Sequence, residues 1–189
     1  MSELESRVEG VLVKDQVVVS DKNMQHVLEQ KGFGETVMGK FYLKPFESLY
    51  LVYVDRLKIF KGRQTVDFDG LMAECIRQDG EAFTKFLIYR DLRSRGYVAK
   101  DGFGFGSDFR VYERGQFMEK GAKYVVFGLS EGRREKVGTL EKQIGQISAM
   151  GKEPVLAVIE RRGEVIYYKI SKIEFQQNRD QPGLSKVEF

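Results

Sequence analysis

The sequence predicts an α/β protein of two domains, with strands and helices mixed in each. Segments in which valine, isoleucine, phenylalanine and tyrosine alternate with polar residues are typical of strands, and segments with apolar residues three or four apart are typical of helices. Both patterns recur in both halves of the 189-residue chain, and Asp79-Gly80 breaks the pattern between them. We therefore expect an N-terminal domain over residues 1–80 and a C-terminal domain over residues 81–189, in which 176–189 form a polar tail.

The first half predicts a hairpin followed by alternating helices and strands. Residues 8–19 indicate two short strands that turn at Lys14-Asp15-Gln16. A helix is expected from Asp21, a suitable N-cap, to Gly32. Another begins at Pro45, because proline at the first helical position needs no partner for an amide proton. The remaining expected elements are strands at 39–43, 57–60 and 66–68 and a helix at 69–79.

The second half predicts helices on either side of a sheet. A helix is expected over 81–95, with Phe83, Phe86, Leu87 and Leu92 on one apolar face and Gly96 at its end. Leu140, Ile144 and Ile147 follow helical spacing within a second helix over 139–150. The expected strands are 97–99, 109–112 and 123–127, followed by a hairpin of 155–159 and 165–170 that turns at Arg161-Arg162-Gly163.

Composition narrows the classes of function. A net charge of +3 permits a polyanionic partner without requiring one. The single cysteine, Cys75, excludes an internal disulfide, and we expect it to be a buried apolar residue in a reducing compartment. No apolar run has the length of a membrane-spanning helix, and the first residues lack the apolar core of a signal peptide, so the expected location is cytoplasmic.

The only histidine is His26, which we expect at or near the surface of a short helix. A single histidine excludes two-histidine zinc sites and two-histidine ribonuclease chemistry within one chain. A Ser-His-Asp triad built around His26 is also not expected, because this residue lies far from the glycine-rich motif. That motif, Gly102-Phe-Gly-Phe-Gly106, leads into a strand rather than a helix, so it favours a tight strand connection over a phosphate-binding loop.

Several motifs in the second half belong together. Tyr89-Arg-Asp-Leu-Arg-Ser-Arg-Gly96 is followed by Phe105-Gly-Ser-Asp-Phe-Arg-Val-Tyr112, then by Gly121-Ala-Lys-Tyr124 and Lys152. Arg90, Arg93 and Arg95 also have a purely structural interpretation. They lie near the end of the expected helix, where positive charges interact favourably with the negative pole of the helix dipole. In order and spacing, however, the motifs resemble the archaeal tRNA-splicing endonucleases, and with Pro45-Phe-Glu-Ser-Leu-Tyr-Leu-Val52 the resemblance covers about residues 39–175.

The resemblance implies a fold and a reaction. It implies a small N-terminal α/β domain and a nuclease-like C-terminal domain with a mixed sheet and flanking helices. The family cuts precursor tRNA at bulge-helix-bulge sites, where a ribose 2′-hydroxyl attacks its own phosphate to leave a cyclic phosphate and a 5′-hydroxyl. A tyrosine acts as base, a histidine as acid and a lysine as an electrostatic stabiliser, with no metal or other cofactor.

This sequence departs from that pattern at the acid. Tyr112 occupies the base position and Lys152 the lysine position, but Gly121 stands where the family has histidine. The arginine that precedes the family's lysine and holds the bulged bases is also missing from residues 145–151. The resemblance therefore implies a structural subunit with no catalytic residues of its own, in which Tyr112 and Lys152 are relics or structural residues.

Such a subunit implies a hetero-oligomer, with two copies beside two copies of a catalytic paralogue that carries the full set, acting on precursor tRNA. Strands at about 164–175 are expected to pair with the partner, so the docking candidates are Glu160, Glu164, Val165, Ile166 and Tyr168. The family's docking loop is acidic, whereas Glu160-Arg-Arg-Gly-Glu164 is mixed in sign. Two alternatives remain: an active homo-oligomeric endonuclease that uses Tyr112 and Lys152 without histidine, and a separate RNA-binding module.

Overall fold

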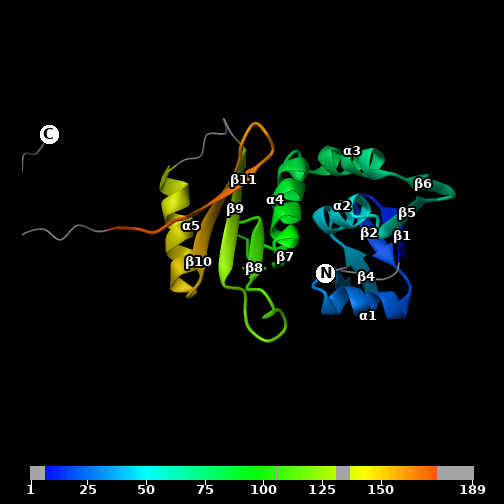
Figure 1. Cartoon of the computed structure of the whole chain (residues 1–189), viewed down its shortest axis with the longest axis horizontal. Coiled ribbons are helices and arrows are strands. Elements are labelled where there is room, and N and C mark those ends of the chain that lie inside the picture. Colours follow the sequence, from blue (N-terminus) through cyan, green and yellow to red (C-terminus); the bar gives the residue numbers. More distant parts are fainter. Residues whose placement is uncertain (1–6, 105, 131–136, 174–189) are drawn as a thin grey trace, which may run out of the picture.

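Two domains lie side by side along the long axis of the molecule (Figure 1). The computed structural model describes residues 7–104, 106–130 and 137–173. Each domain contains a mixed sheet, and five helices are described along these ranges, so the predicted α/β class is confirmed. The first sheet is formed from residues 8–66 and the second from residues 98–169.

The N-terminal sheet has six strands in the order β3-β4-β2-β1-β5-β6. Strands β1 and β5 pair in parallel, and the other neighbours are antiparallel. Burial alternates residue by residue along β1, as expected for a strand with one face on a core. The strands are β1 (Val8–Val13), β2 (Gln16–Val19), β3 (Glu35–Val37), β4 (Lys40–Leu43), β5 (Leu57–Lys61) and β6 (Gln64–Val66).

Three helices pack with this sheet, and local chemistry fixes where they begin. The Asp21 carboxylate accepts hydrogen bonds from the first-turn amides of α1 (Lys22–Gln30), at 2.8 and 3.2 Å. Pro45 is the first residue of α2 (Pro45–Tyr53), which is buried along most of its length. Asp67 caps α3 (Phe68–Gln78) by accepting from the Gly70 amide at 2.9 Å.

The C-terminal sheet has five strands in the order β11-β10-β9-β8-β7, in which only β9 and β10 are parallel. Helix α4 (Ala82–Ser94) lies on one face and α5 (Val137–Ala149) on the other (Figure 1). Val111, Val126 and Ala157 face the core beneath α4, whereas Val125 and Phe127 pack with Ile147 of α5. The strands are β7 (Val98–Asp101), β8 (Phe109–Tyr112), β9 (Tyr124–Ser130), β10 (Glu153–Ile159) and β11 (Val165–Lys169).

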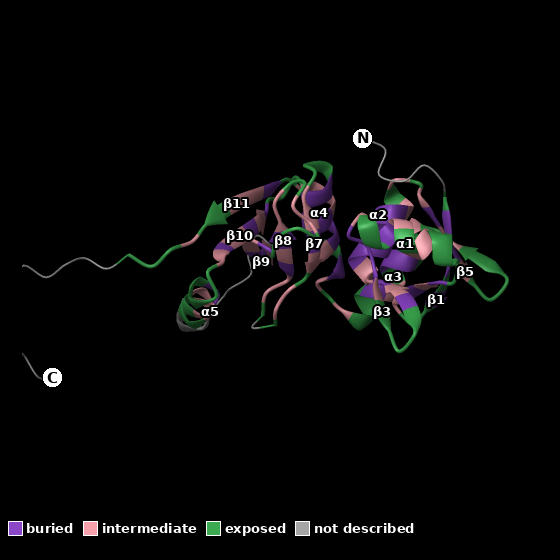
Figure 2. Cartoon of the chain, turned by 90° about the horizontal axis from the view of Figure 1, so that it is seen from below, coloured by how far each residue is buried: buried purple, intermediate pink, exposed green. Residues whose placement is uncertain are grey.

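A shared core joins the two domains where α2 packs on α4. The Phe46 ring of α2 lies 4.9 Å from the Tyr89 ring of α4 and 5.0 Å from the Phe109 ring of β8, between centroids. Buried residues of both domains form one continuous cluster, and Figure 2 shows burial extending along α4 as well as through the N-terminal domain. This packing holds the C-terminal sheet in a defined position relative to the first domain.

Most elements predicted from the sequence are confirmed within one to three residues of their predicted ends, including the hairpin at 8–19 and the buried position of Cys75. Three details of the prediction were wrong. The strand expected at 66–68 lies at 64–66, because Phe68 already begins α3. The short strand β3 was not predicted, and Phe83 is half exposed rather than part of the buried face of α4.

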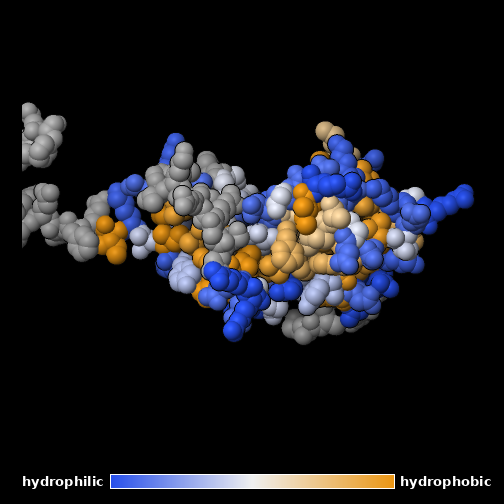
Figure 3. Space-filling model, turned by 90° about the horizontal axis from the view of Figure 1, so that it is seen from above, coloured by the Kyte–Doolittle hydropathy of each residue, from blue (hydrophilic) through white to orange (hydrophobic). Residues whose placement is uncertain are grey.

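Exposed apolar residues gather on the side where α3 meets α4. Ile76 and Phe83 are each about half exposed there, and Figure 3 shows hydrophobic surface over this part of the molecule.

Within the described ranges, no helix combines the length and the apolar character needed to cross a membrane.

Candidate functional site

The residues at the family's catalytic positions meet at one end of the C-terminal sheet. Tyr112 is the last residue of β8 and is half buried, with its ring packed edge-on against Phe117 at 5.0 Å. Lys152 follows α5 and directly precedes β10. Because β10 runs parallel to β9 and pairs Glu153 with Tyr124, the start of β10 lies beside the segment that leads into β9. That segment contains Gly121.

Lys152 lies directly beside Gly121. Its Nζ donates a hydrogen bond to the Ala122 carbonyl at 2.6 Å, and a Cβ placed on Gly121 would be 3.9 Å from the same nitrogen. The lysine ammonium also lies 5.2 Å from the centroid of the Phe103 ring. A side chain at position 121 would therefore project next to the fixed charge of Lys152. Gly121 itself provides no side chain at this position.

Two further charged side chains lie at the same end of the sheet. Lys123 and Glu113 form an ion pair with a distance of 2.6 Å. Their hydrogen bond raises the pKa of Lys123 and lowers the pKa of Glu113, so both groups remain charged near neutral pH. Neither is therefore suited to exchange a proton with substrate in the way that a histidine does.

The histidine of this sequence is remote from this position. His26 is exposed on α1, in the other domain, where its ring is 2.9 Å from the side-chain amide of Gln30. The stretch from Gly145 to Gly151, where the family's arginine is expected, contains none. In the part of the chain that the structure describes, no three His, Cys, Asp or Glu residues are grouped to hold a metal ion.

The glycine run before β8 forms a strand connection. Gly104 and Gly106 have φ of +84° and +78°, values that favour glycine over other residues. Phe105 lies outside the described residues. This arrangement agrees with the interpretation of the motif as a tight turn between β7 and β8.

The residues expected to dock a partner lie along one hairpin. Glu160 and Glu164 are exposed at the turn between β10 and β11, where the Glu160 amide donates to the Glu164 carbonyl at 3.0 Å. Strand β11 is at the edge of the sheet and pairs only with β10 among the described strands. Tyr168 is exposed and Ile166 is half buried, but the Val165 side chain is buried in the core. The polar tail at 176–189 lies outside the described residues.

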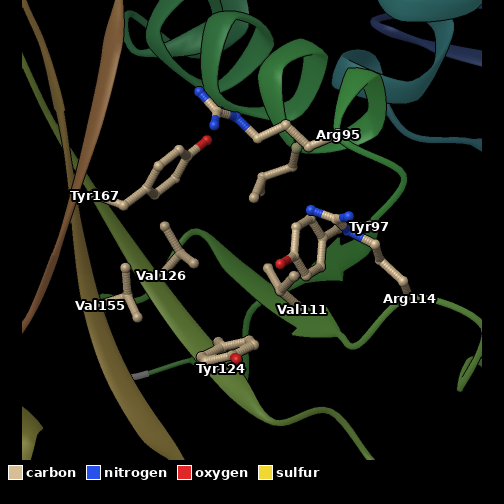
Figure 4. A pocket seen from close by; sticks show the side chains of 9 residues that line it. Arg95, Tyr97, Val111, Arg114, Tyr124, Val126, Val155 and Tyr167 are labelled. Carbon is tan, nitrogen blue, oxygen red and sulfur yellow. The ribbon is translucent and has the colours of Figure 1, made fainter.

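The sequence did not reveal a group of residues on the opposite face of this sheet. Arg95, Tyr97, Arg114 and Tyr167 line a cavity of about 230 Å³ beneath the end of α4 (Figure 4). They are separated along the chain and converge only because α4 crosses the sheet. The one available signal was the interleaving of arginine with tyrosine in residues 89–97.

Comparison with known proteins supports the same family over both domains. A family model for the tRNA intron endonuclease catalytic C-terminal domain matches residues 82–167, and a model for the tRNA intron endonuclease N-terminal domain matches residues 8–72. The tRNA-splicing endonuclease of Thermococcus onnurineus (strain NA1) is 31% identical over 155 residues, covering 82% of this chain and 90% of that protein.

Two further relatives extend the match to nearly the full length. The tRNA-splicing endonuclease of Thermococcus kodakarensis (strain ATCC BAA-918 / JCM 12380 / KOD1) is 32% identical over 162 residues, covering 85% of this chain and 95% of the relative. The tRNA-splicing endonuclease of Methanococcus vannielii (strain ATCC 35089 / DSM 1224 / JCM 13029 / OCM 148 / SB) is 30% identical over 175 residues, covering 92% of this chain and 99% of that protein. The chain therefore belongs to the tRNA intron endonuclease family.

Proposed function

We propose that this chain is a structural, non-catalytic subunit of a tRNA-splicing endonuclease and that a paralogous subunit supplies the catalytic residues. Gly121 carries the proposal, because glycine has no side chain that could protonate the leaving oxygen. The complex would excise introns from precursor tRNA at bulge-helix-bulge sites. The partner is expected to carry the complete tyrosine, histidine and lysine set, and the two chains to assemble two plus two.

The surroundings of the catalytic positions support this assignment. The Lys152 ammonium already donates to the Ala122 carbonyl, and the Tyr112 ring packs against Phe117. Both contacts give these residues a structural role that does not require substrate. The absence of arginine in residues 145–151 removes the expected contact with bulged bases as well.

One observation favours an alternative. Lys152 remains within 3.9 Å of the position that the acid's Cβ would occupy, so it is still placed to stabilise a phosphate. The alternative is an active homo-oligomer that uses Tyr112 and Lys152 without a histidine. The relatives of this chain that are named tRNA-splicing endonuclease have a similar length. This similarity agrees with an enzyme assembled from a single type of subunit.

Cleavage of a bulge-helix-bulge RNA by the purified chain distinguishes the two. We expect the chain alone to cleave at least about 10²-fold more slowly than a complete family member, because a general acid contributes roughly 10² to 10⁴-fold. Cleavage by the pure chain at a rate near that of a complete enzyme would contradict the structural role.

Variants in the assembled complex give a second test. Tyr112→Phe and Lys152→Ala in this chain are expected to leave cleavage nearly unchanged, whereas the equivalent changes in the catalytic partner should abolish it. If Lys152→Ala in this chain alone stopped turnover, the two subunits would have to share an active site. Circular dichroism of each variant checks that the loss of the Ala122 contact has not disturbed the fold.

A further inference from the structure

The C-terminal sheet carries a second concave site on the face opposite the catalytic positions. Its floor is aliphatic: Val155 is half buried there, and the almost fully buried Val111 and Val126 lie beside it on the neighbouring strands beneath the end of α4 (Figure 4). The cavity volume of about 230 Å³ is below the roughly 300–1,000 Å³ of pockets for drug-sized molecules. It therefore suits one small planar group rather than a large ligand.

Arginine and tyrosine form the walls in neighbouring pairs. The Arg95 guanidinium lies 5.8 Å from the centroid of the Tyr167 ring, and the Arg114 guanidinium lies 4.9 Å from that of Tyr97. Burial raises the pKa of Tyr167, so its phenol stays protonated and adds no negative charge to the wall. Flat guanidinium and phenol groups around an apolar floor favour a planar aromatic ligand.

Arg95 and Arg114 differ in whether a carboxylate of the chain forms an ion pair with them. Arg95 is held by Asp91, with Nε to Oδ2 at 2.7 Å and Nη2 to Oδ1 at 3.3 Å. Arg114 is exposed, and within residues 7–104, 106–130 and 137–173 no carboxylate forms an ion pair with it. The neighbouring Glu113 carboxylate is paired with Lys123. Arg114 thus leaves one positive charge at the rim that an anionic ligand can neutralise.

These features together define a ligand with two parts. An isolated inorganic anion would leave Val155 and the tyrosine rings without an apolar contact, and a purely apolar group would leave Arg114 without a counterion. We propose that this cavity binds a single nucleotide of RNA, with the base on the valine floor between the tyrosines and a phosphate at Arg114. Aromatic side chains and arginine are the groups on which unpaired bases stack, and each stacked base contributes substantially to single-strand binding.

The position of the cavity agrees with an RNA ligand. Its lining residues follow closely in sequence on the catalytic positions: Arg114 comes two residues after Tyr112, and Val155 three residues after Lys152. Tyr124 likewise comes three residues after Gly121 and lines the cavity. The two sites are therefore on opposite faces of the same end of the sheet. A strand of RNA that turns around this end could contact both, whether or not the chain itself is catalytic.

Methyl labelling of valine in the full-length protein tests the proposal directly. Adenosine 5′-monophosphate and a short single-stranded oligoadenylate are expected to shift the methyl signals of Val111, Val126 and Val155. Those of Val8 and Val17, in the other domain, should stay in place. Adenosine alone and inorganic phosphate alone should bind at least about tenfold more weakly than the nucleotide, since each satisfies only one half of the site.

Two variants of the site complete the test. Arg114→Ala changes an exposed side chain and should weaken nucleotide binding about tenfold, with Arg63→Ala, an exposed arginine in the N-terminal domain, as the matched control. The dependence of oligonucleotide affinity on salt should also become shallower by about 0.7 in log–log slope, as for one lost phosphate contact. Val155→Phe fills the cavity and should remove base binding, and its melting temperature reports whether the fold is kept.

Several results would overturn the proposal. One is the absence of valine shifts with nucleotide at millimolar concentration. Another is an equal response to phosphate alone, which would reduce the site to an anion contact. A third is a set of valine shifts that appears only on adding a second protein subunit, which would make the cavity a protein interface. None of these outcomes depends on whether the purified chain cleaves RNA.

Discussion

At the scale of single residues, the candidate site is marked by Gly121, which stands at the position where the resemblance implies a histidine. The Lys152 ammonium donates to the Ala122 carbonyl and lies 3.9 Å from the position of a Cβ on Gly121. Gly121 is exposed and is not among the glycines with positive φ, and a Cβ added to it makes only an ordinary contact, so a side chain at this position begins without strain. The backbone at this position therefore does not itself require glycine.

Gly121→His tests this geometry. The variant is expected to be as stable as the wild type within about 0.5 kcal/mol, as for an exposed substitution without strain. The introduced histidine should have a pKa below its ordinary value of roughly 6.5, because the nearby Lys152 ammonium disfavours its charged form. A titration of the ring signals by NMR measures this, and Lys152→Ala in the same background should move the pKa back towards the ordinary value.

The natural histidine, His26, provides a control for this measurement. It is the only other histidine in the sequence and is exposed on α1 in the other domain, so its signals serve as an internal reference. An introduced histidine with a pKa above the ordinary range would show that a carboxylate, and not Lys152, dominates the position. A large loss of stability would show that the segment around Gly121 requires glycine.

Single residues could be predicted from the sequence only where motif spacing identified them. Tyr112, Gly121 and Lys152 were found in this way because each has a fixed place in a recognisable pattern. Arg93 was interpreted as a cation at a helix end, yet it is only 5% exposed and lies 4.0 Å from the Phe33 ring of the other domain. Nothing local in the sequence indicates a contact between residues sixty positions apart.

At the scale of elements, periodicity identified the longer helices and strands, while the shortest strands escaped it. Strand β3 has three residues, two of them exposed, so it presents no alternating pattern and is formed through its pairing with β4. Phe83 fits the helical spacing of the apolar face of α4 but lies beyond the edge of the packed surface. Strand β11, in contrast, was predicted from its sequence, and its place at the sheet edge gives it a distinct role.

Strand β11 is expected to be the main contact with the partner subunit. Ile166 and Tyr168 share the strand face opposite Tyr167, and edge strands of this kind pair readily with another chain. Replacing Ile166 and Tyr168 with aspartate should prevent assembly while leaving the far-ultraviolet circular dichroism of the monomer largely intact. Size-exclusion chromatography with light scattering on the mixed subunits measures the assembly.

A matched control comes from the other domain. Thr65 is exposed on the edge strand β6, so Thr65→Asp adds charge to an edge that is not expected to meet the partner. This variant should assemble as the wild type does. An unaltered complex mass with the β11 double variant would place the interface elsewhere on the chain.

At the scale of the whole molecule, one buried ion pair joins the domains. Lys100 of β7 donates to the Glu47 carboxylate of α2 at 2.9 Å and to the Gly34 carbonyl at 2.8 Å. Glu47 is fully buried and also accepts from the amides of Gly34 and Lys44, at 3.0 and 2.9 Å. The carboxylate thus links the start of α2, the turn before β3 and the C-terminal sheet, so the two domains should unfold as one unit.

Lys100→Met removes the only side-chain cation that is ion-paired with Glu47 among the described residues. A buried charge that has lost its partner typically costs about 3–5 kcal/mol, so the variant should unfold at much lower urea concentration than the wild type.

The additional change Glu47→Gln should recover part of this loss of stability. The amide oxygen can still accept from the two backbone amides, while the amide nitrogen can donate to the Gly34 carbonyl that Lys100 leaves unpaired. Urea unfolding followed by both circular dichroism and tyrosine fluorescence gives the free energies of the three proteins and tests whether the domains separate. If Lys100→Met changed stability by less than about 1 kcal/mol, or if the double variant were the less stable of the two, packing of α2 on α4 would have to hold the domains together without this ion pair.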